Sequence, residues 1–160
     1  MADTLTTVAK TSKVSTGVTA PKKVADALSS ALSATYGLMI ETHITHWNIQ
    51  GPLFYSVHLL TEAQYNELFE ATDVLAERMR SLGALTPMGA KALIGKSTEI
   101  NPEARDMIET LIKGHESLAR QMHELVEVSE GEKDIVTADL ATARSAVHEK
   151  AAWMLRSIAA

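Results

Sequence analysis

The feature that most constrains the fold is a helical period of apolar residues that runs through four long segments of the chain. In the first segment, apolar residues recur every three or four positions, as in a helix that buries one face. They are Leu28, Leu32, Tyr36 and Met39. Pro21 suits the first turn of this helix, and Gly51-Pro52 ends it. We therefore predict a helix that starts at Pro21 and stops before Gly51.

The second helix is predicted from Ser56 to Leu82, because no Gly or Pro interrupts this stretch and Gly83 stops it. Its buried stripe is expected to comprise His58, Glu62, Tyr65, Phe69, Thr72, Ala76 and Met79. Residues 84–98 contain two glycines and one proline, so we predict a connection there, with one short helix within the letters AKALIG. This is the longest connection between the predicted helices.

The third helix is predicted to begin at Asn101-Pro102, a capping residue followed by proline, and to end near Gly131. Its buried residues are expected to be Met107, Leu111, Leu118, Met122 and Leu125. The fourth helix begins between Asp134 and Thr137. Its buried stripe is expected to be Val136, Leu140, Ala143, Val147, Ala151, Met154 and Ile158. Four helices with one long connection predict an all-α four-helix bundle with one crossover.

Composition limits the class of protein. Residues 21–160 form one predicted domain, whereas residues 1–20 hold six threonines and no helical period and are expected to be a flexible tail. The absence of cysteine excludes disulfides and thiolate metal sites. The net charge of -5 disfavours non-specific binding of DNA or anionic membrane over the whole surface. Without an apolar signal core or a membrane-length apolar run, we expect a cytoplasmic protein.

Histidines and carboxylates interrupt the predicted buried stripes of the first two helices. They are His43 and His46 in the first helix, and His58, Glu62, Asp73 and Glu77 in the second. Imidazole nitrogen and carboxylate oxygen suit iron, manganese or zinc. The alternative is that these are interfacial or hydrogen-bonded core residues. Burying unpaired carboxylates costs several kcal/mol each, and a bound metal is the simplest way to offset that cost.

The spacing along the second helix limits how these residues can share a metal. His58 and Asp73 are 15 residues apart, which is roughly 22 Å along the helix axis, too far for one centre. The same 15 residues rotate the helix by about 1500°, so both pairs lie within about 60° of one face. Either there are two sites, or His58 and Glu62 of one subunit meet Asp73 and Glu77 of another across a twofold axis.

Three separated motifs then resemble a known family. They are HWNIQGPLF (residues 46–54) with the histidine at position 58, DVLAER (73–78) and HEKAAWMLRS (148–157). Together they resemble Dps, the DNA-binding proteins from starved cells, which are the mini-ferritin branch of the ferritin-like superfamily. The resemblance covers residues 21–158 and implies a hollow twelve-subunit shell. It also implies oxidation of Fe(II), preferentially with hydrogen peroxide, at centres between twofold-related subunits, with storage of the ferric mineral.

The resemblance also implies roles for single residues. His46 and His58 match the histidine ligands from one subunit, and Asp73 and Glu77 match the carboxylates from its partner, with Glu77 as the bridge. Glu62 stands where the family usually has Asp, so its extra methylene puts the second metal position in doubt. Two further residues, His43 and Trp47, are expected beside the ligands. Trp47 is expected to pack in the core, and the resemblance adds that it can intercept stray oxidising equivalents; the two roles are compatible.

Two further regions are candidates for an iron-entry pore and for DNA binding. Acidic residues surround the turn between the third and fourth helices, and the resemblance implies that Glu130, Asp134 and Asp139 line an iron-entry pore. A solvated turn with capping acids is the alternative. Lys10 and Lys13 in the tail, with Lys22 and Lys23 at the start of the first helix, form a sparse basic arm. If DNA is bound, the arm implies sequence-independent, salt-sensitive binding and association with the nucleoid.

Three functions therefore compete. The first is a peroxide-using ferroxidase with iron storage, which protects the cell and its DNA from oxidative damage. The second is a non-specific DNA-compacting stress protein with a secondary metal site. The third is a structural shell whose core histidines are satisfied by hydrogen bonds. Display of the basic arm on every subunit of a shell would favour the second through multivalency, whereas the acidic body opposes it.

Overall fold

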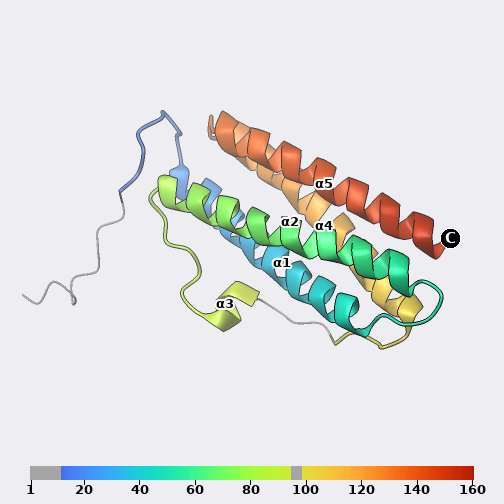
Figure 1. Ribbon diagram of the computed structural model, residues 1–160. Helices are drawn as coiled ribbons and strands as arrows, with labels where there is room; N and C mark the ends of the chain where they lie inside the picture. Colours follow the sequence, from blue (N-terminus) through green and yellow to red (C-terminus); the bar gives the residue numbers. More distant parts are fainter. Residues whose placement is uncertain (1–11, 95–98) are drawn as a thin grey trace, which may run out of the picture.

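A computed structural model of the chain describes residues 12–94 and 99–160, and within them the fold is entirely helical (Figure 1). Four long helices make the body: α1 (Pro21–Asn48), α2 (Phe54–Ser81), α4 (Ala104–Gly131) and α5 (Ile135–Ala159). The short α3 (Ala90–Ile94) lies in the connection between α2 and α4. The predicted all-α bundle with one crossover that carries a short helix is confirmed.

The four long helices are arranged as two antiparallel hairpins. The α1–α2 and α4–α5 pairs make the most extensive contacts, and α1 joins the hairpins by packing on α4. The crossover runs from the far end of α2 past α3, which rests on α1, and reaches the start of α4 at the opposite end of the bundle (Figure 1). The seam between α2 and α5 is the loosest of the bundle.

The buried face of α2 differs from the predicted stripe. The buried residues are Val57, Thr61, Gln64, Leu68, Ala71, Thr72, Leu75 and Met79. Glu62 is exposed, His58 is half-buried, and Phe69 is 65% exposed. The prediction was wrong here because α2 carries apolar residues on two adjacent faces, and periodicity alone does not say which of them the subunit buries. The second face remains at the subunit surface.

The buried face of α5 is displaced from the prediction by about one residue. Val136 is 56% exposed and Ala143 is exposed, whereas the adjacent Thr137 and Arg144 are buried. The buried residues of α5 are Thr137, Ala138, Ala141, Arg144, Ser145, His148, Ala151, Ala152 and Leu155. Small and polar side chains make most of this face, so the apolar period gave the wrong register. The predicted stripe of α4 is confirmed, since all five of its residues are buried.

Local signals explain where the helices begin and end. Gly51 and Gly83 adopt φ values of +85° and +86°, a left-handed conformation that favours glycine after α1 and α2. The side chain of Asn101 accepts a hydrogen bond from the backbone N–H of Glu103 and forms a turn before α4. The helix begins at Ala104, slightly later than predicted. The carboxylate of Asp134 accepts from Thr137 N–H at 3.0 Å and caps α5.

Residues 12–20 contain no helix, but hydrogen bonds hold them against the body. Val14 N–H donates to the Ser81 carbonyl at the end of α2, and Thr19 N–H donates to the Glu132 carbonyl in the α4–α5 turn. Lys23 and Thr19 also donate to the Glu132 carboxylate, which lowers the pKa of that group. This part of the predicted tail therefore follows a defined path. Lys10 lies outside the described residues.

Candidate metal centre

His46 and His58 face each other across the α1–α2 hairpin, close to the loop that joins these helices. Their rings stack with centroids 3.8 Å apart and an interplanar angle of 18°. Nδ1 of His46 lies 3.0 Å from the carbonyl oxygen of His58, and Nδ1 of His58 lies 3.0 Å from the carbonyl oxygen of His46. His46 is 9% exposed and His58 is half-buried.

This reciprocal arrangement fixes the protonation of both rings. A carbonyl oxygen only accepts hydrogen bonds, so Nδ1 of each ring must carry the proton. In the neutral rings the lone pair is then on Nε2, which is the atom available to bind a metal. Metal-binding histidines are usually oriented in this way, by a hydrogen bond from the other ring nitrogen to a carbonyl or carboxylate. The orientation of the two rings is therefore one that metal-binding histidines commonly have.

Aromatic rings continue from this pair on both sides. Phe54 stacks on His58 at 4.9 Å, and Tyr65 presents its edge to His46 at 5.2 Å. His43 stacks between Tyr65 at 4.1 Å and Trp47 at 5.2 Å. Burial, with a smaller effect from His46, lowers the pKa of His43 below its ordinary value, which favours the neutral ring. A chain of ring contacts thus leads from His46 to Trp47, which is 70% exposed.

The predicted carboxylates do not meet these histidines within the subunit. Glu62, Asp73 and Glu77 are exposed on α2, the last two several helical turns beyond His58. Across residues 12–94 and 99–160, no three His, Asp or Glu side chains converge closely enough to hold a metal ion. Glu62, Phe69 and Asp73 follow helical spacing on the surface of α2, beside the exposed Val74. Acids and apolar side chains therefore share an uncovered face.

The acids predicted to line a pore have different environments. Asp134 is only 1% exposed and accepts a hydrogen bond from Arg78 at 2.6 Å. Burial would raise its pKa, but the hydrogen bonds from Arg78 and Thr137 outweigh burial and hold that pKa below its usual range. This carboxylate is therefore occupied inside the subunit as a cap and an ion pair. Glu130 and Asp139 are exposed.

Three polar contacts between helices were not anticipated from the sequence. Arg78 joins α2 to the α4–α5 turn through Asp134, and Arg144 of α5 forms a two-pronged ion pair with Glu67 of α2. His115 of α4 and His148 of α5 meet in the core. His148 opens the third of the quoted motifs, and that position was the available signal. The other contacts join residues far apart in the chain, so spacing could not identify them.

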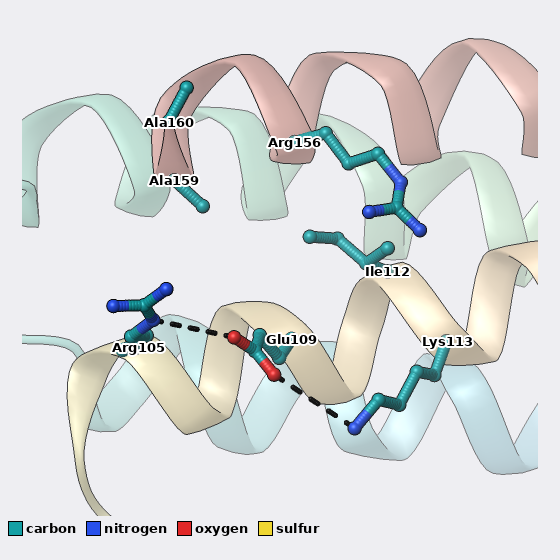
Figure 2. Close-up of a pocket in the computed structure, with 7 residues that line it drawn as sticks. All are labelled: Arg105, Glu109, Ile112, Lys113, Arg156, Ala159 and Ala160. Atoms are coloured by element: carbon teal, nitrogen blue, oxygen red, sulfur yellow. Dashed lines mark hydrogen bonds and ion pairs between the residues drawn. The ribbon is translucent and has the colours of Figure 1, made fainter.

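A pocket of about 330 Å³ lies between the start of α4 and the end of α5 and is bordered by three basic side chains, Arg105, Lys113 and Arg156 (Figure 2). Glu109 bonds to both Arg105 and Lys113, as the dashed lines show, and Arg156 bonds to Glu116. Their charges are therefore largely neutralised, and the pocket is a poor anion site.

Comparison with known proteins gives a consistent result. The ferritin-like domain family matches residues 25–160. A low temperature-induced protein of Nostoc sp. strain PCC 7120 is 37% identical over 84% of this chain and 78% of its own length. Dps from Thermosynechococcus elongatus is 30% identical, with a TM-score of 0.80 over 91% of this chain and 96% of that structure. Dps from Vibrio cholerae O1 is 26% identical, with a TM-score of 0.80 over 94% and 98% of the two chains, and is described as a member of the ferritin-like diiron-carboxylate superfamily.

The described helices contain no segment that is both long and apolar enough to cross a membrane. The bundle with its crossover, the paired histidines and the match over residues 25–160 agree with one another. The chain belongs to the Dps branch of the ferritin-like family.

Proposed function

We propose that this chain is a ferroxidase and iron-storage subunit that oxidises Fe(II) with hydrogen peroxide at centres shared by two subunits of a twelve-subunit shell in the cytoplasm. The observation that carries the proposal is the reciprocal hydrogen bonding of His46 and His58, which leaves both Nε2 atoms available as ligands. Iron is the substrate, and the donor set of imidazole and carboxylate suits it. The same donors also suit zinc or manganese.

A partner subunit would supply the missing carboxylates. Asp73 and Glu77 lie roughly 22 Å and roughly 28 Å from His58 along the axis of α2, so they cannot complete its site. Antiparallel packing of two α2 helices across a twofold axis would bring the acids of one subunit to the histidines of the other and would form two identical sites. The exposed Phe69 and Val74 on α2 support this, because such a contact would bury them. Glu62 would add a carboxylate from the histidine side.

The chemistry explains why a shared, partly enclosed site is useful. Two Fe(II) ions each give one electron, and hydrogen peroxide takes both with two protons and leaves as two water molecules. When peroxide receives only one electron it releases a hydroxyl radical. Holding two iron ions together favours the two-electron outcome. Ring contacts through Tyr65 and His43 connect His46 to Trp47, and in this proposal Trp47 would intercept an oxidising equivalent that escapes.

The acidic turn between α4 and α5 supports an entry route for the substrate. We assign attraction of Fe(II) to Glu130 and Asp139, which are exposed, and leave Asp134 out of the pore because its carboxylate is buried against Arg78. A ring of such carboxylates around a threefold axis would concentrate cations.

The test is anaerobic loading of the assembled protein with Fe(II), followed by hydrogen peroxide. We expect rapid formation of ferric absorbance, consumption of one peroxide for two Fe(II), and retention of the ferric product by the shell. Oxidation no faster than in buffer, or ferric product that precipitates outside the protein, would refute the proposal.

A further inference from the structure

A buried pair of histidines joins the two helices of the second hairpin. Nδ1 of His115 on α4 lies 3.1 Å from Nδ1 of His148 on α5, and the ring centroids are 5.3 Å apart. The two side chains are 1% and 0% exposed. This pair is separate from His46 and His58 and has no part in the proposed iron chemistry.

The hydrogen bond between the rings depends on how many protons they carry. With both rings neutral, one Nδ1–H donates to the lone pair of the other Nδ1. One added proton keeps this bond but introduces a buried positive charge. A second added proton places two N–H groups against each other, so the bond is lost and two like charges lie side by side. The contact is therefore compatible only with a pair that carries at most one added proton.

The charged groups around the pair do not favour protonation. On α5, Arg144 and Lys150 are positive, and on α2 the carboxylate of Glu67 is already engaged by Arg144. On α1, Glu41 approaches Gly114, the neighbour of His115 along α4, and takes part in an interaction of its own. Within the described residues, Nε2 of both histidines has no hydrogen-bond partner.

One of the two rings borders a surface pocket. A pocket of about 330 Å³ lies at the seam between α2 and α5, and its lining includes Gln64, Glu67 and His115. Both amide atoms of Gln64 are buried without a partner among the described residues. The pocket therefore brings the surface close to His115, whose ring itself is buried.

We propose that His115 and His148 form a proton-sensitive contact, the latch, between α4 and α5. The latch stabilises the packing of these helices at neutral pH and stabilises it less as the pH falls. Burial, followed by the charge of Arg144, lowers the pKa of His115 to about 4. Burial, followed by the charges of His115 and Arg144, lowers the pKa of His148 to about 3.

The sign of the pH effect follows from these shifts. In the unfolded chain both histidines take up protons near their ordinary pKa of 6.5, whereas in the folded protein they stay neutral until pH 4 or below. As the pH falls below 6.5, unfolding therefore absorbs protons that the folded state cannot bind. The latch contributes its full stability above pH 6.5 and loses it progressively towards pH 3.

The test compares the assembled wild-type protein with His115→Asn/His148→Asn, because two amides can form one N–H···O hydrogen bond and do not titrate. Urea unfolding followed by circular dichroism at pH 7.5, 6.5, 5.5 and 4.5, at one subunit concentration, gives the dependence of the unfolding constant on pH. We expect wild-type unfolding to take up about two more protons per subunit near pH 5.5 than the double variant. The matched control, His123→Asn at an exposed histidine of α4, should follow the wild type.

A double variant that loses stability in acid as steeply as the wild type would overturn the proposal. If the double variant does not fold at pH 7.5, the proton uptake of wild-type unfolding at pH 5.5 decides, measured by calorimetry in buffers of different ionisation enthalpy. An uptake of about two protons or more per subunit supports the latch, and an uptake below one refutes it.

Discussion

His46 and His58 each donate the Nδ1–H of the ring to the main-chain carbonyl of the other residue, at 3.0 Å in both directions. The relationship ties the end of α1 to the first turns of α2 and sets the tautomer of both rings at once. In the proposed function, this pair supplies the two histidine ligands from one subunit. The carboxylates of Asp73 and Glu77 on the same α2 helix are too distant to complete the proposed site.

We predict that His46→Ala or His58→Ala slows peroxide-driven Fe(II) oxidation by the assembled protein by more than about tenfold, since loss of groups that merely orient metal ligands already costs about 10–100-fold. Each change removes one Nε2 donor and also one hydrogen bond that orients the other ring. Stopped-flow ferric absorbance measures the initial rate. His123→Ala, at an exposed histidine on α4, is the control and should retain the wild-type rate. Wild-type rates in both ligand variants would remove the reaction from this site.

We predict that Asp134→Ala lowers the free energy of unfolding by about 3–5 kcal/mol, because it leaves the guanidinium of Arg78 buried without its partner and removes the cap of α5. Asp134→Asn keeps an oxygen that can accept from Thr137 N–H and should be destabilised less. Urea unfolding at pH 7 measures both. Equal stability of the alanine variant and the wild type would contradict this account.

The same carboxylate makes a prediction about acid. Because the pKa of Asp134 is held below its usual range, its ionised form contributes stability above the unfolded pKa near 3.8, and that stability is lost as the pH falls through the lower folded value. Asp134→Asn should therefore show a shallower loss of stability than the wild type between pH 4 and pH 2. Parallel curves for the two proteins in this range would show that Asp134 is not the group concerned.

The next prediction tests whether DNA binding by the basic arm depends on its charge and not on its length. Deletion of residues 1–18 should preserve the ferroxidase rate, since the bonds of Thr19 and Lys23 to Glu132 remain. If the arm binds DNA, the truncated shell should lose retardation of plasmid DNA at low salt. Full-length Lys10→Gln/Lys13→Gln is the matched control and should lose it equally, because phosphate contacts act through charge. Retardation by the truncated shell equal to that of the full-length protein would place the contact elsewhere.

The helices and the crossover could be predicted from the sequence because their signals are local. Proline and glycine mark the ends of α1 and α2, and the apolar period of α4 identifies its buried face. The buried face of α5 could not be predicted from an apolar period, since it includes the polar residues Arg144 and His148. Their burial depends on partners that come from distant parts of the chain.

The candidate site, too, could be predicted only where its signals are local in the sequence. The histidine pair could be proposed from spacing and motif, but its reciprocal hydrogen bonds depend on how the α1–α2 loop closes. Asp134 belongs to the acidic turn for which the resemblance implies a pore, but its carboxylate is buried against Arg78. Its pairing with Arg78, 56 positions earlier in the chain, is a tertiary contact that composition does not reveal.

The most direct measurement of the central claim mixes two inactive subunits. Shells are assembled from subunits with His58→Ala and subunits with Asp73→Ala, each carrying a different tag so that mixed shells can be isolated. In a mixed pair, one of the two interface sites keeps the native His58 of one subunit and the native Asp73 of the other. With random pairing about one quarter of the sites are intact, so mixed shells should recover roughly that share of the wild-type Fe(II) oxidation rate. Mixed shells that remain as inactive as either parent would show that the centre is not shared between subunits.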